Sequence, residues 1–304
     1  MDPVRYKETK GRDGIALNGI GVGSYEIPDR VAEGVLMHTG MRTNPLRGIG
    51  FTANTFATEV FVDELAVKAG ADPVQFRLGM LKKQPRARHV IEETARMAQW
   101  QRKRPGHGLG VAYVNYSGTQ IAGIADVTVD TATGAIKVHN FWCAIDCGVA
   151  VHPDNVIAQT ESSIVYGVGL ALTERISIAN GAVEQSNFFD YHVPRMRDVP
   201  QMHVKLVQTK NHPTGAGQMA VPLVPSAISN AVFALTGALL RSGANLFTIP
   251  TGEEIPNYVL KGAAALELDA DTLPVSLAYF VRDIKAHMSS NVDRAWSVLL
   301  SNTL

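Results

Sequence analysis

The sequence has 304 residues, of which 46% are hydrophobic and 18% charged, so it can bury one large core or two smaller ones and is not intrinsically disordered. Lys plus Arg equals Asp plus Glu at 28 each, without a long basic run, which argues against nucleic acid or an anionic membrane as a partner. No apolar run reaches the roughly 18 residues of a membrane helix, and the N-terminal stretch lacks a signal-peptide core. We expect a globular protein without membrane insertion, either cytoplasmic or exported together with a partner.

Two helices are predicted in the first third of the chain. Residues 56–70 carry their apolar side chains in a helical stripe, and Gly70 suits the C-terminal end of that helix. Asp72 and Pro73 then provide the N-cap and the first-turn proline of a second helix, which runs through VQFRLGMLKK. Together the two segments predict a helical hairpin.

From residue 121 the hydrophobic period changes from helical to alternating. Residues 121–146 predict a β-hairpin with its turn at TATG. The next segments are predicted as a helix, a second hairpin turned at Asn180-Gly181, a strand and a closing helix, over residues 155–172, 173–188, 202–210 and 225–240. Strand pairs interrupted by long helices indicate the α+β class, with mixed sheets and packed helices.

The C-terminal segment, residues 253–304, differs in character. It carries two predicted helices, and its apolar residues between Leu273 and Val281 form a cluster that is too large to leave in water. We expect a helical appendix that covers or binds another surface.

Cys143 and Cys147 lie near the predicted end of a strand. On an extended chain their spacing spans about 13 Å, which is too far for a disulfide unless the chain turns between them. A metal site would need further ligands, and only His152 is near. Two partly buried thiols are the favoured interpretation, and no metal ligand is predicted.

Two glycines and a glutamine precede the closing helix, in PTGAGQ. One interpretation is that Gly215 and Gly217 form a turn into the helix and that Gln218 is a polar loop residue, because glycine loops before helices are common. The other is that the turn presents Gln218 at a site. The residues alone leave both open.

Five motifs occur in an order that resembles one family. They are RGIGFTANTFATEVFVDELAVKAGADPVQFRL, GTQIAGIADVTVD, CAIDCGVAVHPDNVIAQTESSIVYGVGLAL, QSNFFDYHVPRMRDVP and PTGAGQMAVPLVPSAISNAVFALTG. Together they are similar to the C-terminal portion of the molybdopterin-binding large subunit of the xanthine dehydrogenase and aldehyde oxidase group, with the branch of the isoquinoline 1-oxidoreductase β-subunit nearest. The similarity runs from about residue 15 to residue 250.

The resemblance implies a domain organisation. Residues 1–110 would form part of a first molybdopterin-binding-like domain that contains the helical hairpin, residues 111–252 a second such domain, and residues 253–304 a tail outside the similarity. Family large subunits are much longer, and their N-terminal half has no counterpart here. This implies a second chain that supplies the N-terminal half of a split large subunit, or a chain that no longer binds the cofactor. In the first case, SSIVYGVGLAL and SAISNAVFALTGALL should pack partly against the missing half and be exposed without it.

The first functional hypothesis implied by the resemblance is a molybdenum hydroxylase that oxidises an aldehyde or N-heterocycle, with water as the oxygen source. Its cofactor would be molybdopterin cytosine dinucleotide, shared with the partner chain. Electrons would leave through a separate iron-sulfur subunit, because two cysteines cannot hold a four-cysteine cluster. The alternative is a family member that has lost this redox chemistry and acts as a non-redox enzyme or a scaffold subunit.

The resemblance also implies cofactor-binding positions. Arg47, Gly48 and Ile49 match the loop whose backbone approaches the metal ligands, where glycine permits close contact. A tight turn with a solvated arginine is the alternative. Gln159 matches a glutamine that hydrogen-bonds the dithiolene side of the pterin, although a glutamine on a helix can also be a capping or interface group.

The glycine turn of Gly215, Ala216 and Gly217 matches a further cofactor-binding loop. At the position of Gln218 the family has a glutamate, the base that takes the proton from the metal-bound hydroxyl. An amide cannot in practice accept a proton, so general-base help, worth roughly 10² to 10⁴ in rate, should be missing. Gln218 is therefore predicted to orient a substrate or water in the catalytic site.

Two other positions depart from the family pattern. Thr52 and Ala53 stand where a proline-glutamine pair is common, and Ser162 and Ser163 replace two glycines. Together with the missing base, these departures favour the alternative hypothesis.

Overall fold

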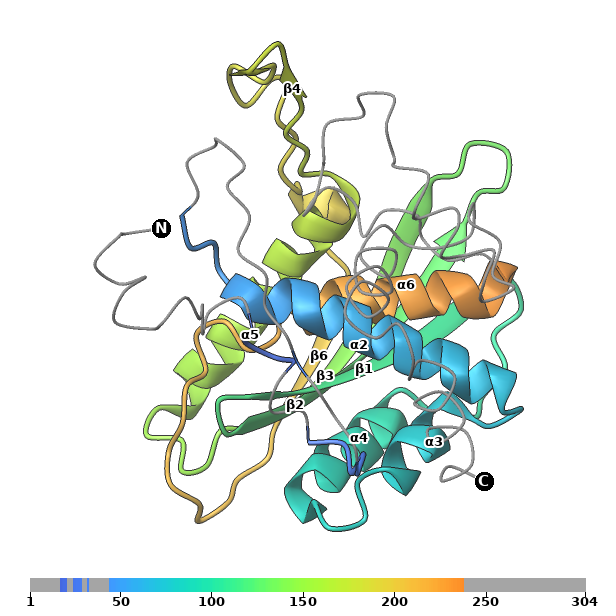
Figure 1. Ribbon diagram of the computed structural model, residues 1–304, viewed down its shortest axis with the longest axis vertical. Helices are drawn as coiled ribbons and strands as arrows, with labels where there is room; N and C mark the ends of the chain where they lie inside the picture. Colours follow the sequence, from blue (N-terminus) through green and yellow to red (C-terminus); the bar gives the residue numbers. More distant parts are fainter. Residues whose placement is uncertain (1–16, 21–23, 29–31, 33–43, 238–304) are drawn as a thin grey trace, which may run out of the picture.

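A four-stranded mixed sheet forms the centre of the protein in a computed structural model that describes residues 17–20, 24–28, 32 and 44–237 (Figure 1). Its strand order is β1-β2-β3-β6, with β1 (Gly108–Tyr116), β2 (Thr119–Val129), β3 (Ile136–Asp146) and β6 (Gln201–Leu206). β1, β2 and β3 are antiparallel neighbours, whereas β6 pairs with β3 in parallel. This confirms the predicted class of mixed sheet and packed helices.

Helices cover both faces of the sheet (Figure 1). The helices are α2 (Ile49–Lys68), α3 (Pro73–Gly79), α4 (Pro85–Met97), α5 (Pro153–Leu172) and α6 (Leu223–Thr236). α6 packs on β1 and β2 and also contacts α2 and α5, while α4 packs on the opposite face. Because neighbouring side chains of a strand point to opposite faces, each of the central strands contributes to two hydrophobic clusters.

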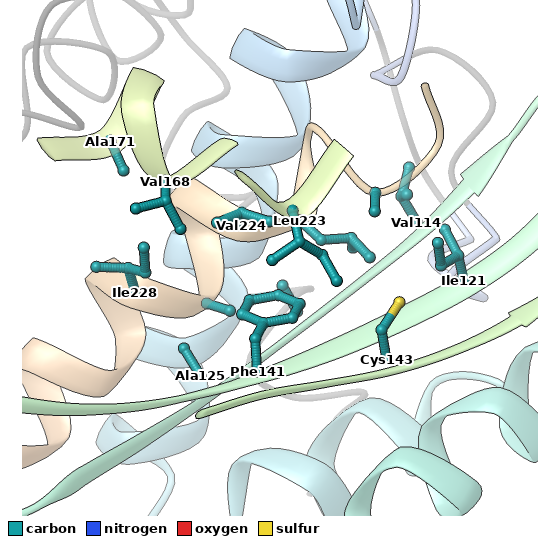
Figure 2. Close-up of a cluster of buried hydrophobic side chains, with 14 of the residues drawn as sticks. Val114, Ile121, Ala125, Phe141, Cys143, Val168, Ala171, Leu223, Val224 and Ile228 are labelled. Atoms are coloured by element: carbon teal, nitrogen blue, oxygen red, sulfur yellow. The ribbon is translucent and has the colours of Figure 1, made fainter. Parts of the chain in front are cut away.

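The larger cluster lies between the sheet and the helices α5 and α6. Figure 2 shows Phe141 of β3 projecting from the sheet toward Leu223 and Val224 at the start of α6. Gly110 of β1 allows α6 to approach closely, because a Cβ atom there would lie 2.1 Å from the backbone nitrogen of Ala231. This packing holds the start of α6 in a fixed position.

Several predicted elements are confirmed, with shifted ends. The Asp72 side chain caps α3 by accepting hydrogen bonds from the backbone N–H groups of Val74 and Gln75, but the helix ends at Gly79. α2 begins at Ile49 rather than at residue 56, because side chains before that residue are also buried against the body of the protein.

The second half of the chain follows the predicted order of elements. The hairpin over residues 121–146 is β2 and β3, and the predicted helix at 155–172 is α5. Asn180 and Gly181 have φ of 51° and 78° and form the turn between the short strands β4 (Ile178–Ala179) and β5 (Ala182–Val183). The strand predicted at 202–210 ends at Leu206, and the closing helix spans Leu223–Thr236.

Three of the described elements were not predicted, namely β1, α4 and the short 3₁₀ helix η1 (Met196–Asp198). β1 joins β2 through a two-residue turn in which Ser117 and Gly118 both have positive φ, 50° and 95°. The predicted domain boundary at residue 110 falls inside β1, and the division into domains stays a prediction. The tail at 253–304 lies outside the described residues.

The predicted exposure of two apolar segments is wrong for the described residues. The first ten residues of α6 are all buried, and so are most residues of the second half of α5, because both helices lie against the sheet and each other. Cys143 and Cys147 are free and buried, as expected for thiols without a disulfide. Among the described helices, none is both long and apolar enough to cross a membrane.

Candidate functional site

The loop that leads into α2 has a backbone conformation that requires glycine. Gly48 has φ of 99°, in the left-handed region, and Ile49 follows with φ of 41°. A Cβ atom on Gly48 would lie 2.1 Å from Thr52 Oγ1 and 3.0 Å from Val221 Cγ1. The loop therefore sits tightly between the first turn of α2 and the chain that enters α6.

Arg47 joins three segments that are far apart in the sequence. Its Nε donates to the carbonyl oxygen of Gly217 at 3.0 Å, and its Nη1 donates to Ser162 Oγ at 2.8 Å. Its Nη2 donates to Ser163 Oγ at 2.9 Å and to Gln159 at both Oε1, 3.1 Å, and the carbonyl oxygen, 3.3 Å. Nη2 also contacts the Gly217 carbonyl closely. The predicted positions 47, 159 and 217 are thus brought together.

The charge of Arg47 is not neutralised by a carboxylate within the described part of the chain. Its hydrogen-bond acceptors are carbonyl and hydroxyl oxygens, and the guanidinium lies 5.8 Å from the ring centroid of Tyr166. Burial lowers the pKa of Arg47, and burial also raises the pKa of the Tyr166 hydroxyl. The site therefore retains a net positive charge next to the N-terminal end of α2, an environment that favours an anionic group.

Gln218 contacts the same loop at Gly48. Its Oε1 accepts a hydrogen bond from the Gly48 backbone N–H at 3.0 Å, and its side chain is half-buried. A backbone N–H at the start of a helix is one of the donors that an anionic ligand can use. The amide of Gln218 thus holds the loop in place by engaging a potential ligand-binding group.

The glycine turn before α6 is held through its carbonyl groups. The Gly215 carbonyl accepts a hydrogen bond of 2.6 Å from Thr119 Oγ1 at the start of β2. Neither Gly215 nor Gly217 has positive φ, so the backbone conformation does not itself require glycine there. Ala216 is half-buried and packs against the core, which gives it a structural contact rather than a polar one.

Several residues of this arrangement were not predicted as contacts. Ser162 and Ser163 were noted only as departures from the family pattern, yet both hydroxyls accept hydrogen bonds from Arg47. Tyr116 donates its hydroxyl proton to the Gly48 carbonyl at 3.2 Å, and its ring stacks on Phe51 at 3.8 Å. Tyr116 is the last residue of β1. A prediction of that strand could have identified Tyr116 as a contact of the loop, but β1 was not predicted.

A buried ionic network supports α2 farther along its length. Glu59 accepts hydrogen bonds from the Tyr25 hydroxyl at 2.8 Å and from Arg77 Nε at 2.9 Å, and Arg77 Nη1 pairs with Asp63 at 2.8 Å. Burial raises the pKa of both carboxyls, and Arg77 opposes that shift. The network ties α2 to α3, and we assign it a structural role.

The donor set fits one wall of a site for an anionic cofactor. The cradle at Gly48 has no space for a side chain, Arg47 has no carboxylate partner among the described residues, and Gln159 and Gly217 are exposed at its edge. No group of three or more His, Cys, Asp or Glu side chains within the described ranges could hold a metal ion. A metal at this site would therefore have to be held by ligands of a bound cofactor rather than by a cluster of these side chains.

Comparison with known proteins identifies the chain's family. Residues 46–200 match the molybdopterin cofactor-binding domain family. The chain is 36% identical over 226 residues to the beta subunit of isoquinoline 1-oxidoreductase from Brevundimonas diminuta, covering 73% of this chain and 29% of that protein. It is 31% identical over 220 residues to a subunit of nicotinate dehydrogenase from Pseudomonas putida, covering 66% and 18% respectively.

The solved structures agree on the fold. Quinoline 2-oxidoreductase from Pseudomonas putida 86 has a TM-score of 0.57 at 15% identity, over 63% of this chain and 50% of that one. The aldehyde oxidoreductase of Desulfovibrio desulfuricans has a TM-score of 0.52 at 15% identity, over 64% and 40%. The chain spans less than a third of the length of its Brevundimonas relative. It belongs to the molybdopterin-binding xanthine oxidase family.

Proposed function

We propose that this chain forms one wall of the molybdenum cofactor site in a hydroxylase, and that a second chain supplies the remaining wall. The observation that carries the proposal is the convergence of Arg47, Gln159 and Gly217 through the hydrogen bonds of one guanidinium group. A positive charge without a carboxylate partner in the described chain suits a cofactor that bears phosphate and thiolate groups.

The residues of this chain have separable roles in the proposal. Arg47 fixes the spacing between α5 and the glycine turn, and Gly48 allows the backbone to approach the cofactor. Gln159 presents an amide at the exposed edge, where it can hydrogen-bond the pterin. The bound cofactor would supply a redox-active metal that takes two electrons from the substrate.

Gln218 is proposed to orient a substrate or water without taking a proton. Its amide can donate and accept hydrogen bonds, but it cannot serve as a base in practice. Its Oε1 is already held by the Gly48 N–H, which leaves the NH₂ group as a donor. Hydroxylation would then be slow, or a base would come from elsewhere in the complex.

The substrate class is proposed from the relatives. The names of the two similar proteins above refer to isoquinoline and nicotinate, both N-heterocycles, and another relative is an aldehyde oxidoreductase molybdenum-binding subunit from Escherichia coli. We therefore propose an aldehyde or N-heterocycle as substrate and molybdopterin cytosine dinucleotide as cofactor. A separate iron-sulfur subunit would accept the electrons.

A non-redox role is the second candidate, and the hydrogen bond between Gln218 and Gly48 favours it. In this arrangement the amide occupies a backbone donor of the site and closes the loop onto the entry to α6. A chain of this kind would keep the fold and use the old cavity for another reaction, or for assembly.

The experiment is the substitution Gln218→Glu, compared with wild type in dye-coupled oxidation of a simple aldehyde or N-heterocycle. Both proteins are prepared with the complementary chain and loaded cofactor. The hydroxylase hypothesis predicts a rise of roughly 10² to 10⁴ in rate, the usual contribution of a general base. Gln208→Glu, a charge change at an exposed position outside the site, is the matched control and should leave the rate unchanged.

The opposite result is equally specific. If the molecule has a non-redox role, Gln218→Glu should not raise the rate of oxidation, because a base at position 218 then has no hydroxylation step to assist. No oxidation by either protein, with molybdenum absent from both preparations, would contradict the hydroxylase proposal.

A further inference from the structure

The segment between α5 and β6 carries a concentration of exposed apolar side chains. This segment, residues 173–200, is called the arm. In Figure 1 its part around β4 extends away from the central sheet. Nine large apolar side chains are exposed among the described residues, and five of them lie in this arm: Ile176, Val183, Phe188, Phe189 and Met196. Isolated exposed apolar residues are normal on a protein surface, whereas several of them within one segment of the chain indicate a binding surface.

Two of these side chains, Phe188 and Phe189, are adjacent in the sequence. Phe188 is 67% exposed and Phe189 is 75% exposed, so the rings are in contact with solvent rather than with the core. Each aromatic side chain can bury about 150–250 Å² when it enters a pocket, which is a large share of the apolar area of a binding site. Phenylalanine is enriched in protein interfaces relative to the rest of the protein surface.

The turn that carries the two rings is fixed by its own hydrogen bonds. Asp190 Oδ2 accepts from the backbone N–H of Ser186 at 2.8 Å and from its hydroxyl at 3.0 Å, and Oδ1 accepts from the Asn187 N–H at 2.9 Å. These bonds lower the pKa of Asp190, so the carboxylate remains charged at neutral pH. The Phe188 N–H also donates to Asn187 Oδ1 at 2.8 Å.

The base of the arm is held in a similar way. The Tyr191 hydroxyl donates to Glu174 Oε2 at 2.8 Å, next to the end of α5. Gln185 binds Ser177 twice, because its Oε1 accepts from the Ser177 N–H at 2.7 Å and its Nε2 donates to the hydroxyl at 2.8 Å. The rings are therefore presented by a preorganised turn, and docking would not require the turn to be ordered at a cost in entropy.

We propose that the Phe188-Phe189 turn docks into an apolar pocket on the complementary portion of the large subunit, the portion that this chain does not contain. The inference rests on the proposed function, since it requires that such a portion assembles with this chain. The arm lies inside the family match at residues 46–200, so it belongs to the cofactor-binding domain rather than to an addition. The match covers only 29% of the Brevundimonas relative, which leaves most of a large subunit to provide the opposing surface.

The test uses the full chain and, as a probe, the part of the Brevundimonas relative that this chain does not match. Association is measured by calorimetry for wild type, for Phe188→Ala with Phe189→Ala, and for Val67→Ala, an exposed apolar residue on α2 outside the arm. Loss of two aromatic interface residues should weaken binding at least about 30-fold, whereas the control should be unchanged. Because both rings are exposed, the double variant should keep the thermal midpoint of the wild type.

A second variant tests the preorganised turn. Asp190→Ala leaves both rings in place but removes the acceptor of the turn, so it should weaken binding by less than the double variant and by more than the control. A surface that binds the probe nonspecifically through its apolar side chains would keep the same affinity in the Asp190→Ala variant.

The outcomes separate the two proposals. If wild type binds the probe and the double phenylalanine variant binds equally well, the docking turn is refuted while the proposed function stands. If wild type does not bind the probe at all, the shared large subunit fails and the docking turn fails with it. If wild type instead forms a dimer in light scattering that the double variant cannot form, the arm binds a second copy and the chosen partner is wrong.

Discussion

Replacement of Gly48 by alanine should destabilise the protein through two separable effects. The first is the left-handed backbone, which costs a residue with a Cβ atom about 1–2 kcal/mol. The second is steric, because the new Cβ atom would lie 2.1 Å from Thr52 Oγ1 and 3.0 Å from Val221 Cγ1. Overpacking of this kind typically costs about 1–3 kcal/mol, so we expect a total loss of about 2–5 kcal/mol.

The matched control for the backbone effect is Gly70→Ala. Gly70 has φ of 65°, but a Cβ atom there would meet no atom of the described part of the chain within 4 Å, so only the backbone cost should remain. Urea unfolding followed by circular dichroism gives both free energies of unfolding. The difference between the two variants measures the steric effect.

Thr52→Ala should rescue part of the loss. Thr52 Oγ1 is buried and has no hydrogen-bond partner among the described residues, so its removal alone should change stability by less than about 1 kcal/mol. In the double variant the most severe contact of the Gly48→Ala side chain disappears, and a favourable coupling of about 1–3 kcal/mol should follow. If Gly48→Ala is no more destabilising than Gly70→Ala, or if Thr52→Ala does not rescue it, the close packing of the loop is wrong.

Three further outcomes are expected. Arg77→Met should cost about 3–5 kcal/mol in urea unfolding, because it leaves the buried carboxylates of Glu59 and Asp63 unpaired, and a loss below about 1 kcal/mol would contradict the ionic network. Burial raises the pKa of Glu64 from 4.5 to about 7 in the folded protein, so the stability contributed by its protonated form is present below pH 4.5 and is lost as pH rises through about 7. Glu64→Gln should therefore remove a decline of up to about 3 kcal/mol between pH 4.5 and 8, and parallel pH profiles of the two proteins would rule this out. Truncation at Thr251 should weaken assembly with the complementary chain while the circular dichroism of the β-hairpins is kept, and an unchanged affinity would show that the tail has no binding role.

Local signals in the sequence predicted the elements that depend on local physics. The Asp72 cap and the Asn180-Gly181 turn are each determined by one or two residues, and the alternation after residue 121 reflects a strand pair. β1 was missed because its residues are buried on both faces, so Gly108–Tyr116 shows no clear alternation of polar and apolar residues. For α4 the signal was present, since Ala87, Val90, Ile91 and Thr94 follow a helical spacing and are its buried residues.

The site could be predicted in its positions but not in its contacts. The resemblance pointed to Arg47, Gln159 and Gln218. Gln159 and Gln218 each lie more than a hundred residues in sequence from the loop at Arg47 and Gly48 that they contact. Their hydrogen bonds depend on how α2, α5 and α6 pack on one another, which no local pattern encodes. For the same reason the two serines at 162 and 163 were noted only as departures from the family pattern, whereas their hydroxyls accept hydrogen bonds from Arg47.

The surface that covers the apolar runs of α5 and α6 could not be predicted from the sequence either. The hydrophobic runs of α5 and α6 were expected to face a missing half, but a long apolar run predicts burial without naming the surface that covers it. The sheet of this same chain covers them. Among the described residues, five of the nine exposed large apolar side chains lie on the arm, and Phe188 and Phe189 are two of them.

The most direct test of the cofactor wall is the molybdenum content of the chain purified together with its complementary chain, measured by mass spectrometry for wild type and for Arg47→Met. Wild type should contain close to one molybdenum per complex, and the variant should lose most of the metal while the two chains still assemble, because Arg47 contacts Gln159, Ser162, Ser163 and Gly217 within the proposed site. Absence of molybdenum from the assembled wild-type complex, or an equal content in the variant, would contradict the assignment of this site to the cofactor.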